Sequence, residues 1–340
     1  MPSAPLAGLS SARPSRPRAV AWRGLLALAA VWLAGAAAAR ELEVAVARGP
    51  VSLLFYVAEH GGHFAAEGVA VRLQDCGSGR ECIARLAEGQ VDAATAAEFV
   101  VTLTGLDRPR HVVVASVGSS VQQIKLVARR SAGIAEPADL RGKRVATVDG
   151  TSARYHLDRW LLYHGIDAAE VELRTLAPEG LAGALARREV DAVVIWEPHA
   201  AAARKALGDD VAALPRPRVY TQHFVLATTG AALAPRRDAL ARLLRALARA
   251  ERLVAEQPAA AAVVLQARLG LGPGEAEAQM AEHDHRLRLD QSLVTTMDSQ
   301  ARWALQSGLA PAGTRPPNML RAIDATLLRQ TVPGAVGLVR

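Results

Sequence analysis

One order of predicted strands and helices occurs twice in this chain, with an offset of about one hundred residues. In the first copy a strand at 42–47 leads through a helix, a strand at 69–75 and a second helix to Val91-Asp92-Ala93. In the second copy a strand at 144–148 leads through the same order to Val190-Asp191-Ala192. Alternating strands and helices favour parallel sheets with right-handed crossovers. The duplication therefore predicts an α/β chain with two similar lobes.

The turn of the second copy combines a glycine with two hydroxyl residues. Gly150 can take the positive φ of a tight turn, and Thr151 or Ser152 can cap the helix that follows. A helix N-terminus at the end of a strand can hold an anion or a polar head group. Taken alone, the two hydroxyls are explained at least as well by capping. The corresponding turn at 49–52 in the first copy favours a ligand contact.

Loops at the carboxyl ends of the strands are the predicted ligand site, because ligands of open α/β sheets bind there. If the lobes face each other, these loops line one cleft. The residues that we expect to contact a ligand are Gly49, Pro50, Val51, Ser52, Ser78, Gly79, Thr95, Ala96, Gly150, Thr151, Ser152, Arg154, Trp196, Glu197 and His223.

Several of these side chains have a structural alternative. Arg154 could hold an anion through a charge-assisted fork, or it could lie on a solvated helix face. Trp196 could stack on a planar ligand or belong to the core, and His223 could contact the ligand or pack in the hinge. Glu98 and Glu197 would oppose an inorganic anion and favour an amine or a ring nitrogen, unless they accept hydrogen bonds from loop amides. The charge of the ligand stays open at this point.

The net charge of +7 depends strongly on the first 39 residues. Residues 1–39 contain four arginines and no acidic residue, so that their removal lowers the charge from +7 to +3. This argues against nucleic acid as a partner. An apolar run at 25–33 and a small-residue tract at 34–39 are typical of an export signal, with an uncleaved anchor as the alternative. We expect a soluble periplasmic protein after cleavage.

Cys76 and Cys82 are six residues apart in the sequence CGSGREC. In an oxidising compartment this spacing permits a disulfide around a small loop, and two reduced cysteines are the alternative. The sequence His283-Asp284-His285 resembles a metal-binding cluster. Alternation along a strand leaves only two of the three on one face, which favours a surface strand and no metal site.

The segment 111–130 is predicted to form two strands around Gly118-Ser119-Ser120 and to cross from the first lobe to the second. The strand at 219–229 is predicted to return. The expected division is residues 1–39 as signal peptide, 40–122 and 224–340 as lobe 1, and 123–223 as lobe 2. Helices follow, with a break at Pro258 and a helix from Asp290 or Ser292 to Gly308.

Four segments together resemble the substrate-binding proteins of bacterial ABC importers in the sulfonate, nitrate and taurine group. They are LRGKRVATVDGTSARYHL, GQVDAATAAE, EVDAVVIWEPHAAAA and LDQSLVTTMDSQARWA. The thiamine-precursor-binding proteins are relatives of that group. The resemblance implies a type II periplasmic-binding-protein fold, with two lobes joined by two crossover strands and a hinged cleft. It places Gly150-Thr151-Ser152, Thr95-Ala96 and Trp196-Glu197-Pro198 at the ligand.

The resemblance also implies a function, which is capture of a small organic or inorganic anion and its delivery to a membrane permease and its ATPase. Binding of a nitrogen-containing ring, such as a pyrimidine thiamine precursor, is the alternative. An enzyme or a sensor domain on the same fold is a third interpretation. The sequence offers no constellation for catalysis, since Lys125 and Lys143 are its lysine candidates and Lys143 precedes its strand. We expect a monomer without a cofactor.

Overall fold

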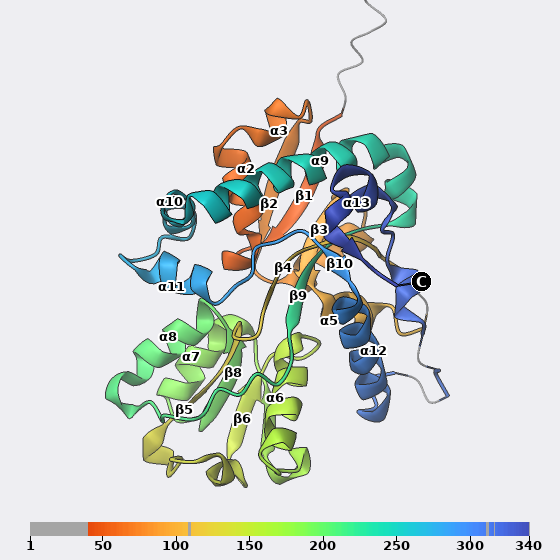
Figure 1. Ribbon diagram of the computed structural model, residues 1–340. Coiled ribbons are helices and arrows are strands. Elements are labelled where there is room, and N and C mark those ends of the chain that lie inside the picture. The colour runs from red at the N-terminus through yellow and green to blue at the C-terminus, as the bar shows by residue number, and fades with distance from the viewer. Residues whose placement is uncertain (1–39, 108–109, 311–312, 316, 340) are drawn as a thin grey trace, which may run out of the picture. The chain divides into compact units, whose positions relative to one another are not determined.

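Two sheets organise the chain, and each is built on one copy of the duplicated pattern (Figure 1). The computed structural model describes residues 40–107, 110–310, 313–315 and 317–339. The predicted export segment 1–39 lies outside the described residues. In the order of the first sheet, its strands are β2 (Val71–Cys76), β1 (Leu42–Ala47), β3 (Ala93–Ala97), β9 (Gln222–Thr228) and β4 (Val112–Ser120). The second sheet has the order β5 (Ile124–Ala128), β8 (Ala192–Trp196), β6 (Arg144–Thr147) and β7 (Glu172–Thr175).

The two sheets repeat one arrangement of strands. Strand β1 pairs in parallel with β2 and β3, as β6 does with β7 and β8. An antiparallel strand then follows on the corresponding side, β9 beside β3 and β5 beside β8. β9 also pairs with β4, which forms the edge of the first sheet. The chain passes from the first sheet to the second after β4 and returns before β9 (Figure 1). The predicted α/β fold with two crossovers is thereby confirmed. The lobe boundaries at 122/123 and 223/224 stay a prediction.

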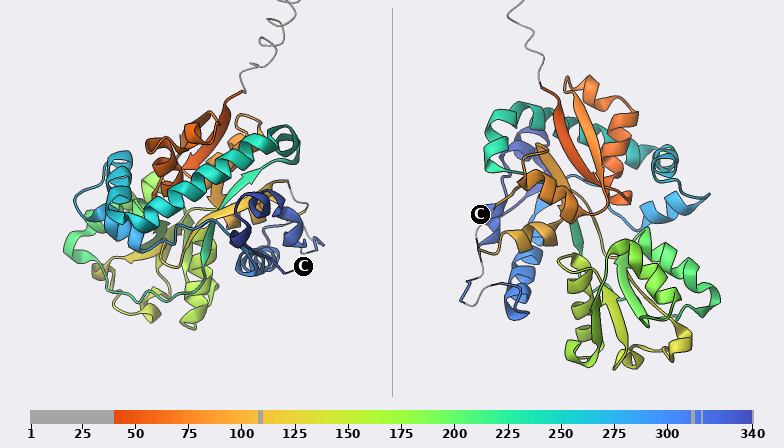
Figure 2. Two further views of the ribbon diagram at one scale, coloured as in Figure 1. Left: turned by 45° about the horizontal axis from the view of Figure 1, so that its top comes forward. Right: turned by 180° about the vertical axis from the view of Figure 1, so that it is seen from behind.

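The helices connect and flank these strands. They are α2 (Leu53–His60), α3 (His63–Ala66), α4 (Gly79–Ala87), α5 (Glu98–Thr104), α6 (Ser152–Tyr163), α7 (Pro178–Ala186), α8 (His199–Leu207), α9 (Gly230–Glu256), α10 (Pro258–Leu269), α11 (Glu275–Ala281), α12 (Gln291–Gln306) and α13 (Thr326–Thr331). A short pair, β10 (Leu289–Asp290) with β11 (Val336–Gly337), joins the start of α12 to the tail. Figure 2 shows α9 lying along one side of the first sheet. No helix in the described part of the chain has the length and apolar content needed to cross a membrane.

The repeated Val-Asp-Ala motif has a structural role in both sheets. Asp92 accepts a hydrogen bond from the backbone N–H of Glu43 at 3.0 Å, and Asp191 accepts one from the N–H of Arg144 at 3.0 Å. Each aspartate therefore anchors the beginning of the first strand of its own copy, β1 or β6. Asp191 also pairs with the buried Arg129 guanidinium at 3.0 Å. The duplication thus extends to individual hydrogen bonds.

The predicted break at Gly118-Ser119-Ser120 is wrong. These three residues belong to β4 and pair with Phe224, His223 and Gln222 of β9, so the break falls at 121–123 instead. Because β9 returns antiparallel beside them, their backbone groups have partners and the strand continues. Gly118 is needed for another reason. A Cβ atom at this position would lie 2.8 Å from the carbonyl oxygen of Asp284.

The segment around Asp284 forms a bridge to β4. Backbone hydrogen bonds join Asp284 and Ser119 in both directions, at 2.8 and 2.9 Å. The prediction of a surface strand at 283–285 is wrong for His285, whose side chain is buried. His285 is buried because the bridge to β4 turns this residue toward the protein interior.

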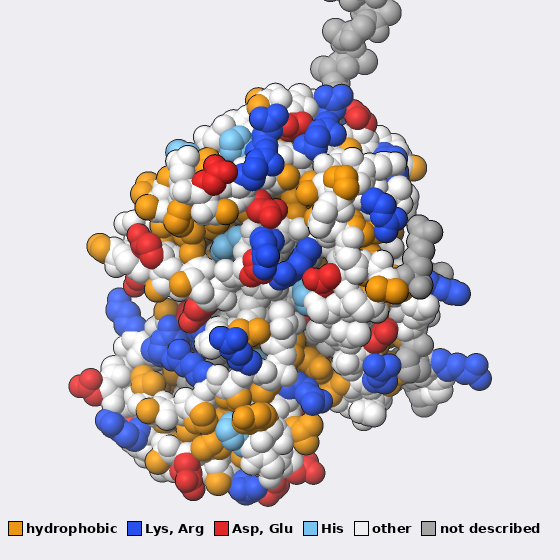
Figure 3. All heavy atoms as spheres, viewed as in Figure 1, with side chains coloured by type: hydrophobic (Ala, Val, Ile, Leu, Met, Phe, Trp, Pro, Cys, Tyr) orange, Lys and Arg blue, Asp and Glu red, His pale blue; other side chains and the backbone are white. Residues whose placement is uncertain are grey.

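Charged side chains of opposite sign lie close together on the face shown in Figure 3. The basic face of α9 illustrates this pattern. Arg245 and Arg249 both pair with Glu67, at 2.8 and 2.6 Å, and Arg242 donates to the carbonyl oxygen of Glu67. The arginines of this helix face are therefore partly neutralised within the fold.

Candidate ligand-binding site

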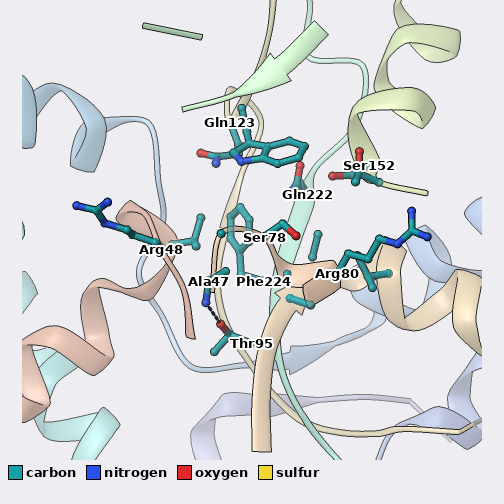
Figure 4. Close-up of a pocket in the computed structure, with 17 residues that line it drawn as sticks. Ala47, Arg48, Ser78, Arg80, Thr95, Gln123, Ser152, Gln222 and Phe224 are labelled. Carbon is teal, nitrogen blue, oxygen red and sulfur yellow. Dashed lines mark hydrogen bonds between the residues drawn. The ribbon is translucent and has the colours of Figure 1, made fainter. Parts of the chain in front are cut away.

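A pocket that opens to solvent lies where the loops of the two copies meet (Figure 4). The space between its lining atoms, together with the open solvent at its mouth, amounts to about 600 Å³. The lining residues come from both sheets and from the two crossovers between them. They are Ala47, Arg48, Val51, Gly77, Ser78, Gly79, Arg80, Thr95, Ala96, Ala97, Val100, Gln123, Thr151, Ser152, Trp196, Gln222 and Phe224.

Eight of the predicted site residues line this pocket: Val51, Ser78, Gly79, Thr95, Ala96, Thr151, Ser152 and Trp196. Seven do not: Gly49, Pro50, Ser52, Gly150, Arg154, Glu197 and His223. Four of the seven, Gly49, Pro50, Ser52 and Gly150, form or support the turns of the pocket loops. The other three have partners elsewhere.

Ser52 and Gly150 are examples of this supporting role. The Ser52 side chain is fully buried and donates to the carbonyl oxygen of Ala47 at 2.7 Å. Gly49 and Pro50 lead into the same short helical turn, Pro50–Ser52. Gly150 has a φ of 67° and a Cβ atom there would lie 2.7 Å from the Arg80 guanidinium. A glycine is therefore required at this turn.

Arg154 and Glu197 are engaged elsewhere. The Arg154 guanidinium pairs with Asp158 at 3.2 Å, one turn along α6. Asp158 also accepts a hydrogen bond from the indole N–H of Trp303 in α12 at 3.0 Å. The buried Glu197 carboxylate accepts from the N–H of Ala201 and pairs with Arg204, at 2.8 and 2.7 Å. Neither side chain is placed to set the charge of a ligand.

Two arginines and no acidic side chain are found among the described residues that line the pocket. Arg48 and Arg80 stand on opposite sides of it in Figure 4. The carboxylate of Glu98, the counterpart of Glu197, is fully buried behind the pocket. It accepts from the N–H of His223 at 2.9 Å and lies 2.6 Å from the Gln300 amide nitrogen. Burial raises the pKa of Glu98 to about 8, so the site is electrostatically positive.

Two helices begin at the pocket, one from each copy. Ser78 caps α4 by accepting from the N–H of Glu81 at 3.3 Å. Thr151 caps α6 by accepting from the N–H of Ala153 at 3.3 Å, and it donates to the carbonyl oxygen of Val148. The first N–H groups of a helix have no intrahelical acceptor and carry the positive end of its dipole. An anion at this place would meet two such helix ends.

Gln123 and Gln222 are pocket residues that the sequence reasoning missed. Both are buried, and each lies in one of the two crossover segments. The hydroxyl of Tyr220 donates to the carbonyl oxygen of Gln222 at 3.1 Å, which leaves the amide N–H₂ of Gln222 for the pocket.

The orientation of Gln123 follows from His283. Nδ1 of His283 lies 2.6 Å from the carbonyl oxygen of Gln279, so Nδ1 carries the proton. Burial lowers the pKa of His283, which keeps the ring neutral and Nε2 free to accept. Oε1 of Gln123 lies 2.7 Å from Nε2, and because an accepting Nε2 needs a donor, the Gln123 amide is assigned the orientation rotated by 180°, which donates its N–H there. Its carbonyl oxygen is then left to accept from a ligand.

The remaining wall of the pocket is apolar. Phe224, Val51 and Val100 contribute to it from the first sheet and its helices, and the half-buried Trp196 contributes from the end of β8. Phe224 packs against His283 with ring centroids 5.9 Å apart. The pocket therefore combines a positively charged end, an apolar wall and the side-chain amides of Gln123 and Gln222.

His223 packs in the hinge instead of lining the pocket. Its Nε2 lies 3.3 Å from the hydroxyl of Ser292 at the start of α12. Burial lowers the pKa of His223 to about 4. The neutral imidazole is thus part of the contact between β9 and α12.

Cys76 and Cys82 form a disulfide with their Cα atoms 5.7 Å apart. It encloses the loop that contributes Gly77, Ser78, Gly79 and Arg80 to the pocket. In the part of the chain that the structure describes, no group of three or more His, Cys, Asp and Glu side chains is arranged to hold a metal ion.

Comparisons with solved structures show the same fold in periplasmic binding proteins. The alkanesulfonate-binding protein SsuA from Xanthomonas axonopodis pv. citri, bound to MOPS, is 16% identical with a TM-score of 0.69, over 88% of this chain and 98% of its own. The nitrate-binding protein NrtA from Synechocystis PCC 6803 is 13% identical with a TM-score of 0.64. The match covers 86% of this chain and 88% of NrtA. The desulfurization enzyme DszB has the fold too, at 18% identity and a TM-score of 0.61, over 86% and 99%.

No curated protein sequence matches the chain significantly. A family model described as NMT1/THI5 like matches residues 50–261, which include most of both copies and all of the pocket loops from Val51 to Phe224. The chain belongs to the NMT1/THI5-like family.

Proposed function

We propose that this protein is the extracytoplasmic solute-binding component of an ABC importer and that it binds a small organic anion. The observation that carries the proposal is the pairing of two helix N-termini, from α4 and α6, with Arg48 and Arg80 around a pocket lined by no acidic side chain in the described chain. Helix ends and guanidinium groups both stabilise a negative charge. The fold shared with sulfonate- and nitrate-binding proteins supports the same function.

The ligand is proposed to be organic because a bare inorganic ion would not use the apolar wall. The carbonyl oxygen of Gln123 and the N–H₂ of Gln222 favour a ligand whose neutral end carries a donor and an acceptor. An aminoalkanesulfonate or a substituted sulfonate fits these requirements.

Binding is proposed to work by hinge closure. An anion contacts α4 of the first copy and α6 of the second together only when the lobes are closed, so the ligand shifts the population toward the closed state. The closed form would then be recognised by a permease and its ATPase at the membrane. With an export signal predicted at 1–39, we propose that the protein acts in the periplasm as a monomer.

A second candidate is a nitrogen-containing ring such as an aminopyrimidine, as in the thiamine-precursor-binding relatives. The glutamine pair beside Trp196 favours it, since the two amides could pair with a ring nitrogen and its amino group. An enzyme is a weaker interpretation, although DszB has the same fold. Cys76 and Cys82 are joined in a disulfide, so neither offers a thiolate nucleophile.

The test is a thermal-shift screen of the oxidised protein without residues 1–39. The panel is ethanesulfonate, taurine, MOPS, nitrate, benzoate and 4-amino-5-hydroxymethyl-2-methylpyrimidine. A solute at 100 times its Kd should stabilise the folded state by about 2.7 kcal/mol. Stabilisation by sulfonates supports the proposal, and stabilisation by the pyrimidine alone favours the second candidate. If no member of the panel changes the Tm, the proposal of an organic anion is wrong.

A further inference from the structure

The disulfide lies at the base of a pocket loop and is buried on both sides. Cys76 is the last residue of β2 and is 2% exposed, while Cys82 lies in the first half of α4 and is 0% exposed. Five residues separate the two cysteines, and the first four of them, Gly77 to Arg80, line the pocket. The crosslink therefore encloses the part of the first copy that faces the second.

The side chains of the enclosed loop contribute little to the core. Gly77 and Arg80 are exposed, and Ser78 and Gly79 are half-buried. Two of the four residues at 77–80 are glycines, which allow this backbone many alternative conformations. The loop contains no large apolar side chain that could anchor it in the core, so the sulfur atoms are its apolar anchor.

Binding depends on the position of this short loop in several ways. Ser78 caps α4, and the loop packs so closely on β3 that a Cβ atom at Gly79 would lie 2.8 Å from Cα of Ala96. Arg80 reaches the second copy and donates to the carbonyl oxygen of Asp149 at 3.0 Å. A small movement of the loop would thus displace the helix end, the hydroxyl and the guanidinium together.

Ordering such a loop when the ligand arrives would weaken binding, because the lost conformational freedom is subtracted from the binding free energy. A crosslink removes that freedom beforehand. The complete burial of both sulfur atoms means that the crosslink persists as long as the protein is folded. This points to a permanent brace and not to a switch.

We propose that the Cys76–Cys82 disulfide is a positioning crosslink for ligand binding, which holds the loop 77–80 in its binding conformation. This inference rests on the proposed function of the pocket. It assigns the two cysteines a role in affinity in addition to any role in stability.

The test compares the protein with two variants, Cys76→Ser/Cys82→Ser and Cys76→Val/Cys82→Ala. The second fills the buried site with apolar groups and guards against a variant that fails to fold. Leu185→Ala is the control, because Leu185 is fully buried in the second lobe's core and far from the loop in sequence. It should lower stability while leaving the crosslink intact.

Two readouts are used. Hydrogen exchange of the amides at 77–82 in the free protein is expected to be at least about ten-fold faster in the cysteine variants and unchanged in Leu185→Ala. The Kd for taurine, measured by calorimetry, is expected to rise about ten-fold in the cysteine variants and to stay the same in the control. The loop in both folded variants should therefore be mobile while the remaining amides stay protected.

Folded cysteine variants with unchanged exchange and unchanged Kd would overturn the proposal and leave the disulfide a purely structural role. If both variants fail to fold, the crosslink serves folding and the proposal is also wrong. If taurine does not bind the unmodified protein, the solute assignment fails in this assay. The exchange rates still decide whether the crosslink holds the loop.

Discussion

The guanidinium of Arg80 donates a hydrogen bond to the carbonyl oxygen of Asp149 at 3.0 Å and so connects the pocket loops of the two copies. Arg80 belongs to the first turn of α4, and Asp149 belongs to the turn before α6. The contact spans the pocket mouth between the two helix ends. It identifies Arg80 as a residue that can both attract an anion and hold the pocket loops of the two copies together.

Arg80→Ala should therefore weaken anion binding in two ways. The loss of one charge-assisted contact is expected to raise the Kd for an alkanesulfonate about ten-fold or more, equal to at least ~1.4 kcal/mol. The free protein should also be more open, with a larger radius of gyration in X-ray scattering. Arg110→Ala is the matched control, since Arg110 is exposed and pairs with Asp107 outside the pocket. An unchanged Kd in Arg80→Ala would remove this arginine from the site.

A change of charge at Gln123 should distinguish the two candidate ligands. Gln123→Glu places a carboxylate in the pocket and beside His283, and it should weaken alkanesulfonate binding by more than about ten-fold through repulsion. Gln123→Leu removes the amide without adding charge and should weaken alkanesulfonate binding less. Calorimetry with taurine and with the aminopyrimidine measures both. Stronger binding of the pyrimidine by the glutamate variant would favour the nitrogen-containing ring.

Glu98→Gln should change how stability depends on pH. The pKa of Glu98 is raised from 4.5 to about 8 by burial, so between these values the folded state keeps a proton that the unfolded state has lost. Stability of the unmodified protein therefore falls as the pH rises from about 4.5 to about 8.

The measurement is urea unfolding of Glu98→Gln and the unmodified protein at pH 5, 6, 7 and 8. The variant should gain stability relative to the unmodified protein across this range, by on the order of a few kcal/mol in total. The exposed Glu256→Gln is the control and should show a constant difference. A pH-independent difference for Glu98→Gln would mean that Glu98 is ionised throughout.

Asp191→Ala should be strongly destabilising. It removes the acceptor of the Arg144 N–H and leaves the guanidinium of Arg129, 8% exposed, without its carboxylate. Breaking a buried ion pair from one side costs roughly 3–5 kcal/mol. Asp191→Asn keeps an acceptor for the Arg144 N–H and should lower the free energy of unfolding less. Equal stability of the alanine variant and the unmodified protein in urea unfolding would contradict the anchoring role of the repeated motif.

The sequence predicts the fold and half of the pocket for one physical reason. Parallel strands bring their carboxyl ends to one edge, so a duplicated strand order places Thr95 and Thr151 near a common site without further information. Hydrophobic periodicity also gives the bounds of β1 correctly. These features depend on short-range pattern alone.

The misassigned residues depend on side-chain partners. Arg154 lies four residues before Asp158, a spacing that already indicates an ion pair on one helix face. Glu197 and Arg204, which also form an ion pair, are two helical turns apart, a spacing that indicates such a pair less strongly. Gln123 and Gln222 could not be found in this way. Each lies at a crossover, where the position of the side chain follows from the packing of both lobes.

The most direct test of the account is the calorimetric titration of taurine into the oxidised protein and into Ser152→Trp. Ser152 lines the pocket at the first residue of α6, so an indole there would block the helix end that is proposed to hold the anion. We expect one-to-one binding to the unmodified protein and no heat of binding to the variant, whose thermal unfolding stays cooperative. Equal affinity for both proteins would contradict it.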